Sequence, residues 1–165
     1  MILIVEDDRY SGHILAELLE IEGFEVLTAD SADEALEILK KRNKEITVVI
    51  SDIMMKTGEM MSEIETRGGF ETGFILSAII RNAFPRINII GISGGTELSK
   101  MKESKLFDYV FMKPLINTDV LVDALKIIKS KKESKIELID AINISPSFFG
   151  IGVDFKKIIK WLNEK

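Results

Sequence analysis

The sequence lacks several features that mark particular classes of protein. It contains no cysteine, which excludes disulfides, thiolate metal sites and cysteine nucleophiles. Its single histidine excludes a multi-histidine metal site. No apolar run approaches the roughly 20 residues that a membrane span needs, so no membrane association is expected. Because a strand pattern begins at residue 1, we expect no signal peptide and predict a cytoplasmic protein.

Composition and charge are those of an ordinary globular protein. The 165 residues suffice for one domain with a sizeable core, and 46% of them are hydrophobic and 30% charged. The net charge of -5 argues against a protein that coats nucleic acid. No direct contact with nucleic acid is therefore expected.

Short apolar runs alternate with helical patterns along the first 130 residues. The expected strands are 1–5, 24–29, 46–52, 87–93 and 109–112, and the expected helices are 14–21, 32–42, 72–84, 98–106 and 120–128. Asp30 or Ser31 is expected to cap the second helix, and Thr118 or Asp119 the fifth. This alternation favours right-handed crossovers. It predicts an α/β fold, namely a doubly wound, flavodoxin-like, five-stranded parallel sheet with helices on both faces.

Two segments fall outside this alternation. Residues 56–73 are longer than a usual strand-to-helix loop, and we expect a passive surface insertion there rather than a lid. Residues 131–165 form a C-terminal extension to a domain at 1–130. Its last helix, capped by Asp154, is amphipathic and is expected to pack on the domain, with a partner interface as the alternative. Four aromatic residues favour a role of the extension in docking or in a homodimer: Phe148, Phe149, Phe155 and Trp161.

Polar residues stand where the expected strands end. They are Glu6, Asp7, Asp52, Ser93 and Lys113. The carboxyl ends of parallel strands meet at one edge of a sheet, so we expect these side chains to converge. Clustered carboxylates require a cation, and oxygen ligands without histidine or cysteine favour Mg²⁺. A carboxylate can attack phosphorus to form an acyl phosphate, while Mg²⁺ and an ammonium neutralise the phosphoryl oxygens.

Four motifs at these strand ends resemble the receiver domain of two-component response regulators. They are ILIVEDD over residues 2–8, SDIMM over 51–55, GISG over 91–94 and FMKPL over 111–115. The resemblance covers about residues 1–130 and implies a phosphorylation-dependent signalling switch. A sensor histidine kinase or phosphotransfer protein would supply the phosphoryl group, and a downstream protein target would respond through protein–protein contact.

The resemblance implies a metal site and a phosphoacceptor. Asp52 aligns with the phosphoacceptor aspartate, which in this family also binds the metal. Asp7 aligns with a direct Mg²⁺ ligand, and Glu6 with a carboxylate that acts through water. The backbone carbonyl of Met54 aligns with a further ligand.

The resemblance also assigns two residues of the switch. Ser93 takes the place of the hydroxyl that moves toward the phosphoryl group and shifts the surface around the last two strands. Lys113 takes the place of the family's lysine, and its bond to Pro114 is expected to be cis. Such a protein catalyses its own Mg²⁺-dependent phosphorylation and dephosphorylation rather than the turnover of a separate substrate.

Three positions depart from the family pattern. Lys56 stands where a proline is usual, and the loop after it is about ten residues too long. Val110 stands where an aromatic switch residue is frequent, and Tyr109 should point to the opposite face of the strand, which argues against aromatic gating. Gly94-Gly95 predicts a mobile loop after the fourth strand.

Two other functions fit parts of the pattern. One is a receiver-like interaction module that keeps the acidic pocket without being phosphorylated. The other is a flavodoxin-like binder of a small molecule, since the topology is shared. The second lacks a phosphate-binding loop after the first strand, where Glu6-Asp7-Asp8 would repel an anion.

Overall fold

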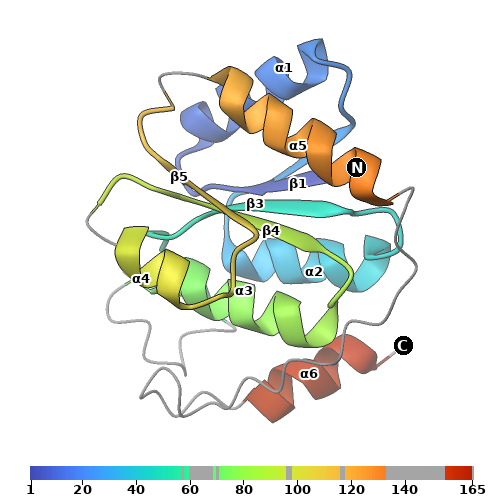
Figure 1. Cartoon of the computed structure of the whole chain (residues 1–165). Helices are drawn as coiled ribbons and strands as arrows, with labels where there is room; N and C mark the ends of the chain where they lie inside the picture. Colours follow the sequence, from blue (N-terminus) through green and yellow to red (C-terminus); the bar gives the residue numbers. More distant parts are fainter. Residues whose placement is uncertain are drawn as a thin grey trace.

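A parallel sheet forms the middle layer of the molecule (Figure 1). The computed structural model describes residues 1–56, 58–59, 69, 71–95, 98–115, 118–132 and 155–164. The strands are β1 (Ile2–Val5), β2 (Val26–Ala29), β3 (Val48–Asp52), β4 (Asn88–Ser93) and β5 (Tyr109–Met112). The helices are α1 (Arg9–Ile21), α2 (Ala32–Arg42), α3 (Thr72–Ala83), α4 (Leu98–Glu103), α5 (Thr118–Lys132) and α6 (Phe155–Asn163).

The strands pair in the order β2-β1-β3-β4-β5, all parallel. Helices α1 and α5 cover one face of the sheet, while α2, α3 and α4 cover the other (Figure 1). Alternate residues of each inner strand enter the two hydrophobic clusters, as with Leu3 on the α3 side and Ile4 on the α1 side. The predicted doubly wound fold is therefore confirmed.

Helix and strand boundaries differ from the prediction where local hydrogen bonds intervene. Strand β2 begins at Val26 rather than residue 24, because Phe24 N still donates to Leu19 O (3.0 Å) in the C-terminal turn of α1. Helix α4 ends at Glu103 rather than 106, because Lys105 adopts a left-handed φ of 56°.

Side-chain caps start the first two helices. Asp8 accepts a hydrogen bond from Tyr10 N at the start of α1, and Ser31 accepts one from Glu34 N at the start of α2. The choice of Ser31 settles the second predicted cap. The predicted cap of α5, Thr118 or Asp119, was wrong, because α5 begins at Thr118 and both residues therefore lie inside the helix.

Helix α3 is enclosed on all sides. Every residue from Thr72 to Ile80 is buried, which is unusual for a helix in the outer layer of a three-layer fold. Its outward side is covered by α6, which packs against α3 and α2 and buries Ile158 and Leu162. The terminal helix therefore packs on the domain, as expected.

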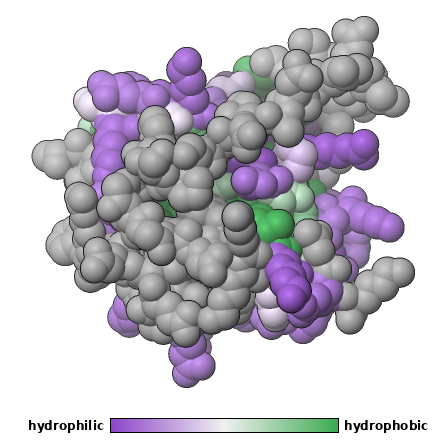
Figure 2. All heavy atoms as spheres, turned by 90° about the horizontal axis from the view of Figure 1, so that it is seen from below, coloured by the Kyte–Doolittle hydropathy of each residue, from purple (hydrophilic) through white to green (hydrophobic). Residues whose placement is uncertain are grey.

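The rest of the extension is not part of the described residues. The predicted cap Asp154 and the side chains of Phe148, Phe149 and Phe155 lie outside them. Figure 2 shows the α6 side of the molecule, where the coloured residues include a small hydrophobic area bordered by hydrophilic side chains. Among the described residues, no helix combines the length and hydrophobicity that a bilayer crossing requires.

Candidate functional site

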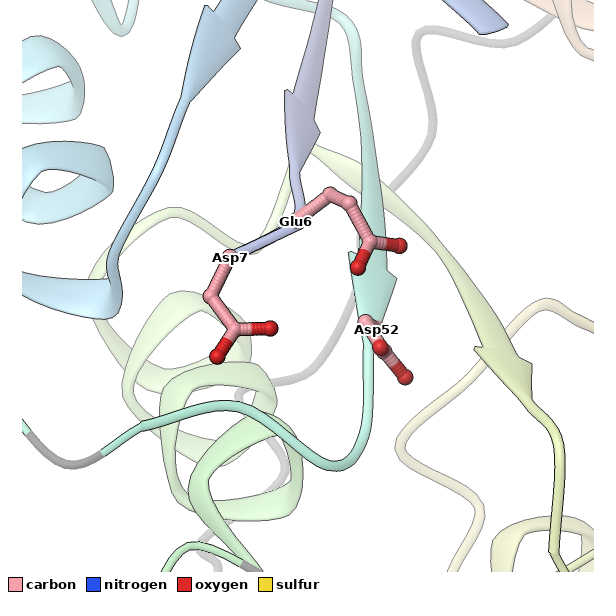
Figure 3. Close-up of side chains that lie close together, drawn as sticks. All are labelled: Glu6, Asp7 and Asp52. Atoms are coloured by element: carbon pink, nitrogen blue, oxygen red, sulfur yellow. The ribbon is translucent and has the colours of Figure 1, made fainter. Parts of the chain in front are cut away.

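Three carboxylates converge at the carboxyl edge of the sheet. Glu6 and Asp7 follow β1 directly, and Asp52 is the last residue of β3, the strand beside β1. Each offers an oxygen atom within 4.8 Å of an oxygen of the others. Figure 3 shows the three side chains extending from neighbouring strand ends into one space. The convergence of these residues follows from the parallel pairing of β1 with β3.

Lys113 joins two of these carboxylates from the opposite side. It follows β5, and its Nζ lies 2.5 Å from Glu6 Oε2 and 2.7 Å from Asp52 Oδ2. The side chains of Glu6 and Asp52 are only 10% and 9% exposed, and that of Lys113 is 31% exposed. Partial burial strengthens these charge-assisted hydrogen bonds relative to surface ion pairs. The ammonium therefore holds the phosphoacceptor candidate in a fixed position.

The surroundings shift two pKa values in this pocket. Burial raises the pKa of Glu6, and the nearby negative charge of Asp52 adds to that effect, although the hydrogen bond from Lys113 opposes it. Burial alone would lower the pKa of Lys113, but its hydrogen bonds to Asp52 and Glu6 outweigh burial and leave that pKa raised. Lys113 is therefore a permanent cation at neutral pH, while Glu6 holds a proton to a higher pH than an exposed glutamate.

Backbone amides position the remaining carboxylate oxygens. Met54 N donates to Asp52 Oδ1 (3.2 Å), and Lys56 N donates to Asp7 Oδ2 (3.1 Å). The segment after β3 is therefore bonded to both acids. The Met54 side chain is exposed at the mouth of the pocket.

Ser93 lies at the end of β4 with its side chain fully buried. Its hydroxyl accepts a hydrogen bond from Gly95 N (3.3 Å), and its carbonyl accepts one from Lys113 N (2.9 Å). Ser93 therefore ties the loop after β4 to the strand end that carries the lysine. The Lys113–Pro114 bond is cis, as expected.

The two residues before Phe111 point to opposite faces of β5. Tyr109 packs with the hydrophobic cluster on the α1 and α5 side, and Val110 packs with the cluster on the α3 side. The expected orientation of Tyr109 is confirmed. An aromatic side chain is therefore missing from the position where the family frequently has one.

One residue that contacts the backbone of Asp52 was not identified from the sequence. Gly73, in the first turn of α3, donates its N–H to Ile53 O (3.0 Å), and a Cβ at this position would overlap the carbonyl oxygen of Asp52. Its signal was a glycine inside a helix, where glycine is unfavourable unless the backbone needs close approach. Helix α3 thus begins directly against the end of β3.

The single histidine of the chain, His13, is a surface side chain of α1. Its Nε2 lies 3.2 Å from Glu17 Oε1 on the next turn. Among the described residues, the side chains that could hold a metal ion in the pocket are the carboxylates of Glu6, Asp7 and Asp52. Oxygen donors of this kind suit a hard divalent cation.

A doubly wound sheet that holds three carboxylates and an ammonium at its carboxyl edge is the architecture of a receiver domain. The sequence profile described as response regulator receiver domain matches residues 2–126. The chain belongs to this family.

Known proteins agree with this assignment. A putative NtrX-like response regulator of Rickettsia bellii is 31% identical over 138 residues, which are 81% of this chain and 26% of that protein. A response regulator receiver domain from Clostridium thermocellum has 26% identity and a TM-score of 0.65, over 80% of this chain and 95% of that one. Response regulator TrrA from Thermotoga maritima, in complex with Mg²⁺ and BeF, has 26% identity and a TM-score of 0.61, over 77% of this chain and 96% of that one. The chain thus spans about a quarter of the length of its curated relative.

Proposed function

We propose that this protein is a phosphorylation-dependent signalling switch whose Asp52 accepts a phosphoryl group from a phosphohistidine. The observation that carries the proposal is the position of Lys113, whose Nζ contacts both Asp52 and Glu6 at the edge where Asp7 also lies. A structural ion pair would need one carboxylate, whereas phosphoryl transfer needs a nucleophile, a metal site and a separate cation.

The proposed reaction assigns one task to each group. A carboxylate oxygen of Asp52 forms the new O–P bond while the P–N bond of the donor histidine breaks and its imidazole departs. Lys113 neutralises the charge of one phosphoryl oxygen, and the hydroxyl of Ser93 donates a hydrogen bond to another phosphoryl oxygen. Water later hydrolyses the acyl phosphate and regenerates Asp52. The protein thus catalyses its own phosphorylation and dephosphorylation.

Mg²⁺ is the proposed cofactor. Asp7, Asp52 and the carbonyl of Met54 would bind it, and Glu6 would act through a water molecule. The ion supplies charge neutralisation for the transferred group. The chemistry of the oxygen donors and the Mg²⁺ in the complex of TrrA support this assignment.

The pH dependence of Mg²⁺ affinity tests the role of Glu6. Since its pKa is raised above its ordinary 4.5, a proton competes with the ion until the pH exceeds that raised value. Affinity is expected to rise with pH above 4.5, by at most about tenfold per unit for one released proton, and then to level off. Titration calorimetry at several pH values measures this, and Glu6→Gln should bind more weakly with a shallower pH dependence. An equal pH dependence of Mg²⁺ affinity in the natural protein and in Glu6→Gln would show that Glu6 takes no part in binding the ion.

Exposed apolar residues beside the pocket support docking of the phosphodonor on α1. Helix α1 starts two residues after Asp7 and exposes Tyr10, Ile14, Leu18 and Ile21 along one side. Exposed apolar side chains at spacings of four and three residues form a stripe that suits a partner helix. A histidine kinase or phosphotransfer protein docked there would hold its histidine at the pocket.

The remaining assignments concern the whole protein. A downstream protein target, a homodimer and a location in the cytoplasm are proposals, as is the division into a receiver at 1–130 and an extension at 131–165. The passive role of the 56–73 insertion and the absence of direct nucleic-acid contact stay predictions.

Treatment of the full chain with acetyl phosphate and Mg²⁺ tests the proposal. We expect intact-mass spectrometry to detect the addition of one phosphoryl group, and Asp52→Asn to abolish it. Asp8→Asn is a matched control, since Asp8 is exposed and caps α1. No mass gain in the natural protein would favour the interaction module that is not phosphorylated.

A further inference from the structure

Helix α6 covers an apolar surface of α3. The outward side of α3 is as apolar as its inward side, with Phe74, Ile75, Leu76, Ile79 and Ile80 all fully buried. Helices of a three-layer fold normally expose one polar face to water. In this state α6 covers the apolar surface formed by α2 and α3 (Figure 1).

The contact between α6 and this surface is small. Ile158 and Leu162 are its two buried side chains among those described, and Trp161 and Ile159 are half-buried beside them. The ammonium of Lys40 on α2 lies 4.1 Å from the centre of the Trp161 ring. Two buried aliphatic residues and one half-buried cation–π contact stabilise a docked helix only moderately. A modest change in α3 is therefore enough to shift the docking equilibrium.

The N-terminal turn of α3 contacts Asp52, the proposed phosphoacceptor. Gly73 leaves no space for a Cβ between the first turn of α3 and the backbone of Asp52 and Ile53. An ion pair between Glu71 and Lys100 links this turn to α4, and the Phe74 ring packs edge-on against Phe107 with centroids 5.6 Å apart. Packed elements of this kind move as units rather than deform. A displacement at Asp52 is therefore transmitted along α3.

We propose that the α2–α3 surface is an intramolecular docking site for α6 and that phosphorylation of Asp52 releases α6 from it. The inference rests on the proposed function of Asp52. A phosphoryl group replaces the present bonds of Asp52 to Met54 N and Lys113 Nζ, so the segment that follows Asp52 rearranges. Because Gly73 is in contact with that segment, the first turn of α3 moves with it. The docked position of α6 fits only the unphosphorylated arrangement.

The sole tryptophan of the chain reports on the docking. Beryllofluoride with Mg²⁺ serves as the probe on the full chain, and ¹⁹F NMR establishes that the pocket is loaded. We expect loading to move Trp161 emission to longer wavelength and to increase its quenching by acrylamide. In Asp52→Asn, neither the ¹⁹F signal nor the emission should change.

The outcomes separate the inference from the function on which it rests. A loaded pocket with unchanged Trp161 emission, or with a shift to shorter wavelength, overturns the release of α6 and leaves the phosphoacceptor assignment intact. A pocket that does not load at all overturns both.

If loading of the Asp52 pocket weakens the docking of α6, then weaker docking must favour loading by the same factor, which gives a second test. Leu162→Asn, which weakens docking, is expected to raise the affinity for beryllofluoride by about fivefold, the lower end of typical coupling between sites. Lys40→Gln removes the cation–π contact without altering the hydrophobic contact and should act in the same direction. Lys41→Gln is the control, because Lys41 instead pairs with Glu37 on α2. Equal affinities in all four proteins would overturn the inference.

Discussion

Lys113→Met is expected to slow phosphorylation of Asp52 by about 100-fold or more, the cost of removing one preorganised charged donor from a transition state. Methionine keeps the length of the side chain and removes only the ammonium. Without it, no protein cation contacts Asp52 among the described residues, and negative charge on the transferred group is opposed by the metal alone. The rate is measured as mass gain over time with acetyl phosphate and Mg²⁺.

The same substitution should leave metal binding in place. Removal of an ammonium 2.5 Å from Glu6 increases the negative potential of the pocket, so Mg²⁺ affinity is expected to stay equal or increase. Lys56→Met is the matched control, since its exposed side chain carries the same charge while only its backbone N–H bonds Asp7. A Lys113→Met protein that is phosphorylated at the natural rate would show that the lysine is structural.

Gly73→Ala should lower the free energy of unfolding by roughly 3 kcal/mol or more, as overpacking against rigid backbone does. The added Cβ would overlap the Asp52 carbonyl oxygen and lie 2.6 Å from Ile53 Cα, and neither atom can rotate away. Alanine is favoured over glycine in a helix by about 1 kcal/mol, so any net loss comes from this clash. Urea unfolding measures the change.

Gly12→Ala provides the control for Gly73→Ala. Gly12 also lies in a helix, but a Cβ there would sit 3.4 Å from Glu6 Cβ, an ordinary contact. The same exchange should therefore be neutral or stabilise the protein by up to about 1 kcal/mol. Similar urea midpoints for the two variants would contradict the close contact between α3 and the end of β3.

The sequence contained most of the information about the sheet and its polar edge. Buried strands need uninterrupted β-branched runs, such as Ile46 to Ile50, and these runs stop where acids begin. A parallel topology then brings the strand ends together whatever the intervening sequence. The positions of Glu6, Asp7 and Asp52 were predictable for that reason.

Contacts made by helices across long connections were not predictable. The pattern of α6 showed an apolar side but not its location, because the long segment that joins Lys132 to Phe155 does not specify which part of the domain the helix reaches. The pairing of Lys40 with Trp161 depends on that location. The start of β2 at Val26 likewise depends on hydrogen bonds that Gly23 permits through a φ of 83°, which no residue pattern specifies to one position.

The pocket is completed by the last strand of the sheet to be synthesised. Glu6 and Lys113 are 107 positions apart, and β5 adds the lysine at the edge of a sheet whose inner strands all precede it. Until that strand has paired, Glu6 and Asp52 lack the ammonium of Lys113, and the proposed phosphoryl transfer lacks one of its charges. The proposed phosphorylation of Asp52 is therefore expected only in chains that have finished folding, and an incomplete or misfolded copy is not expected to transmit a signal.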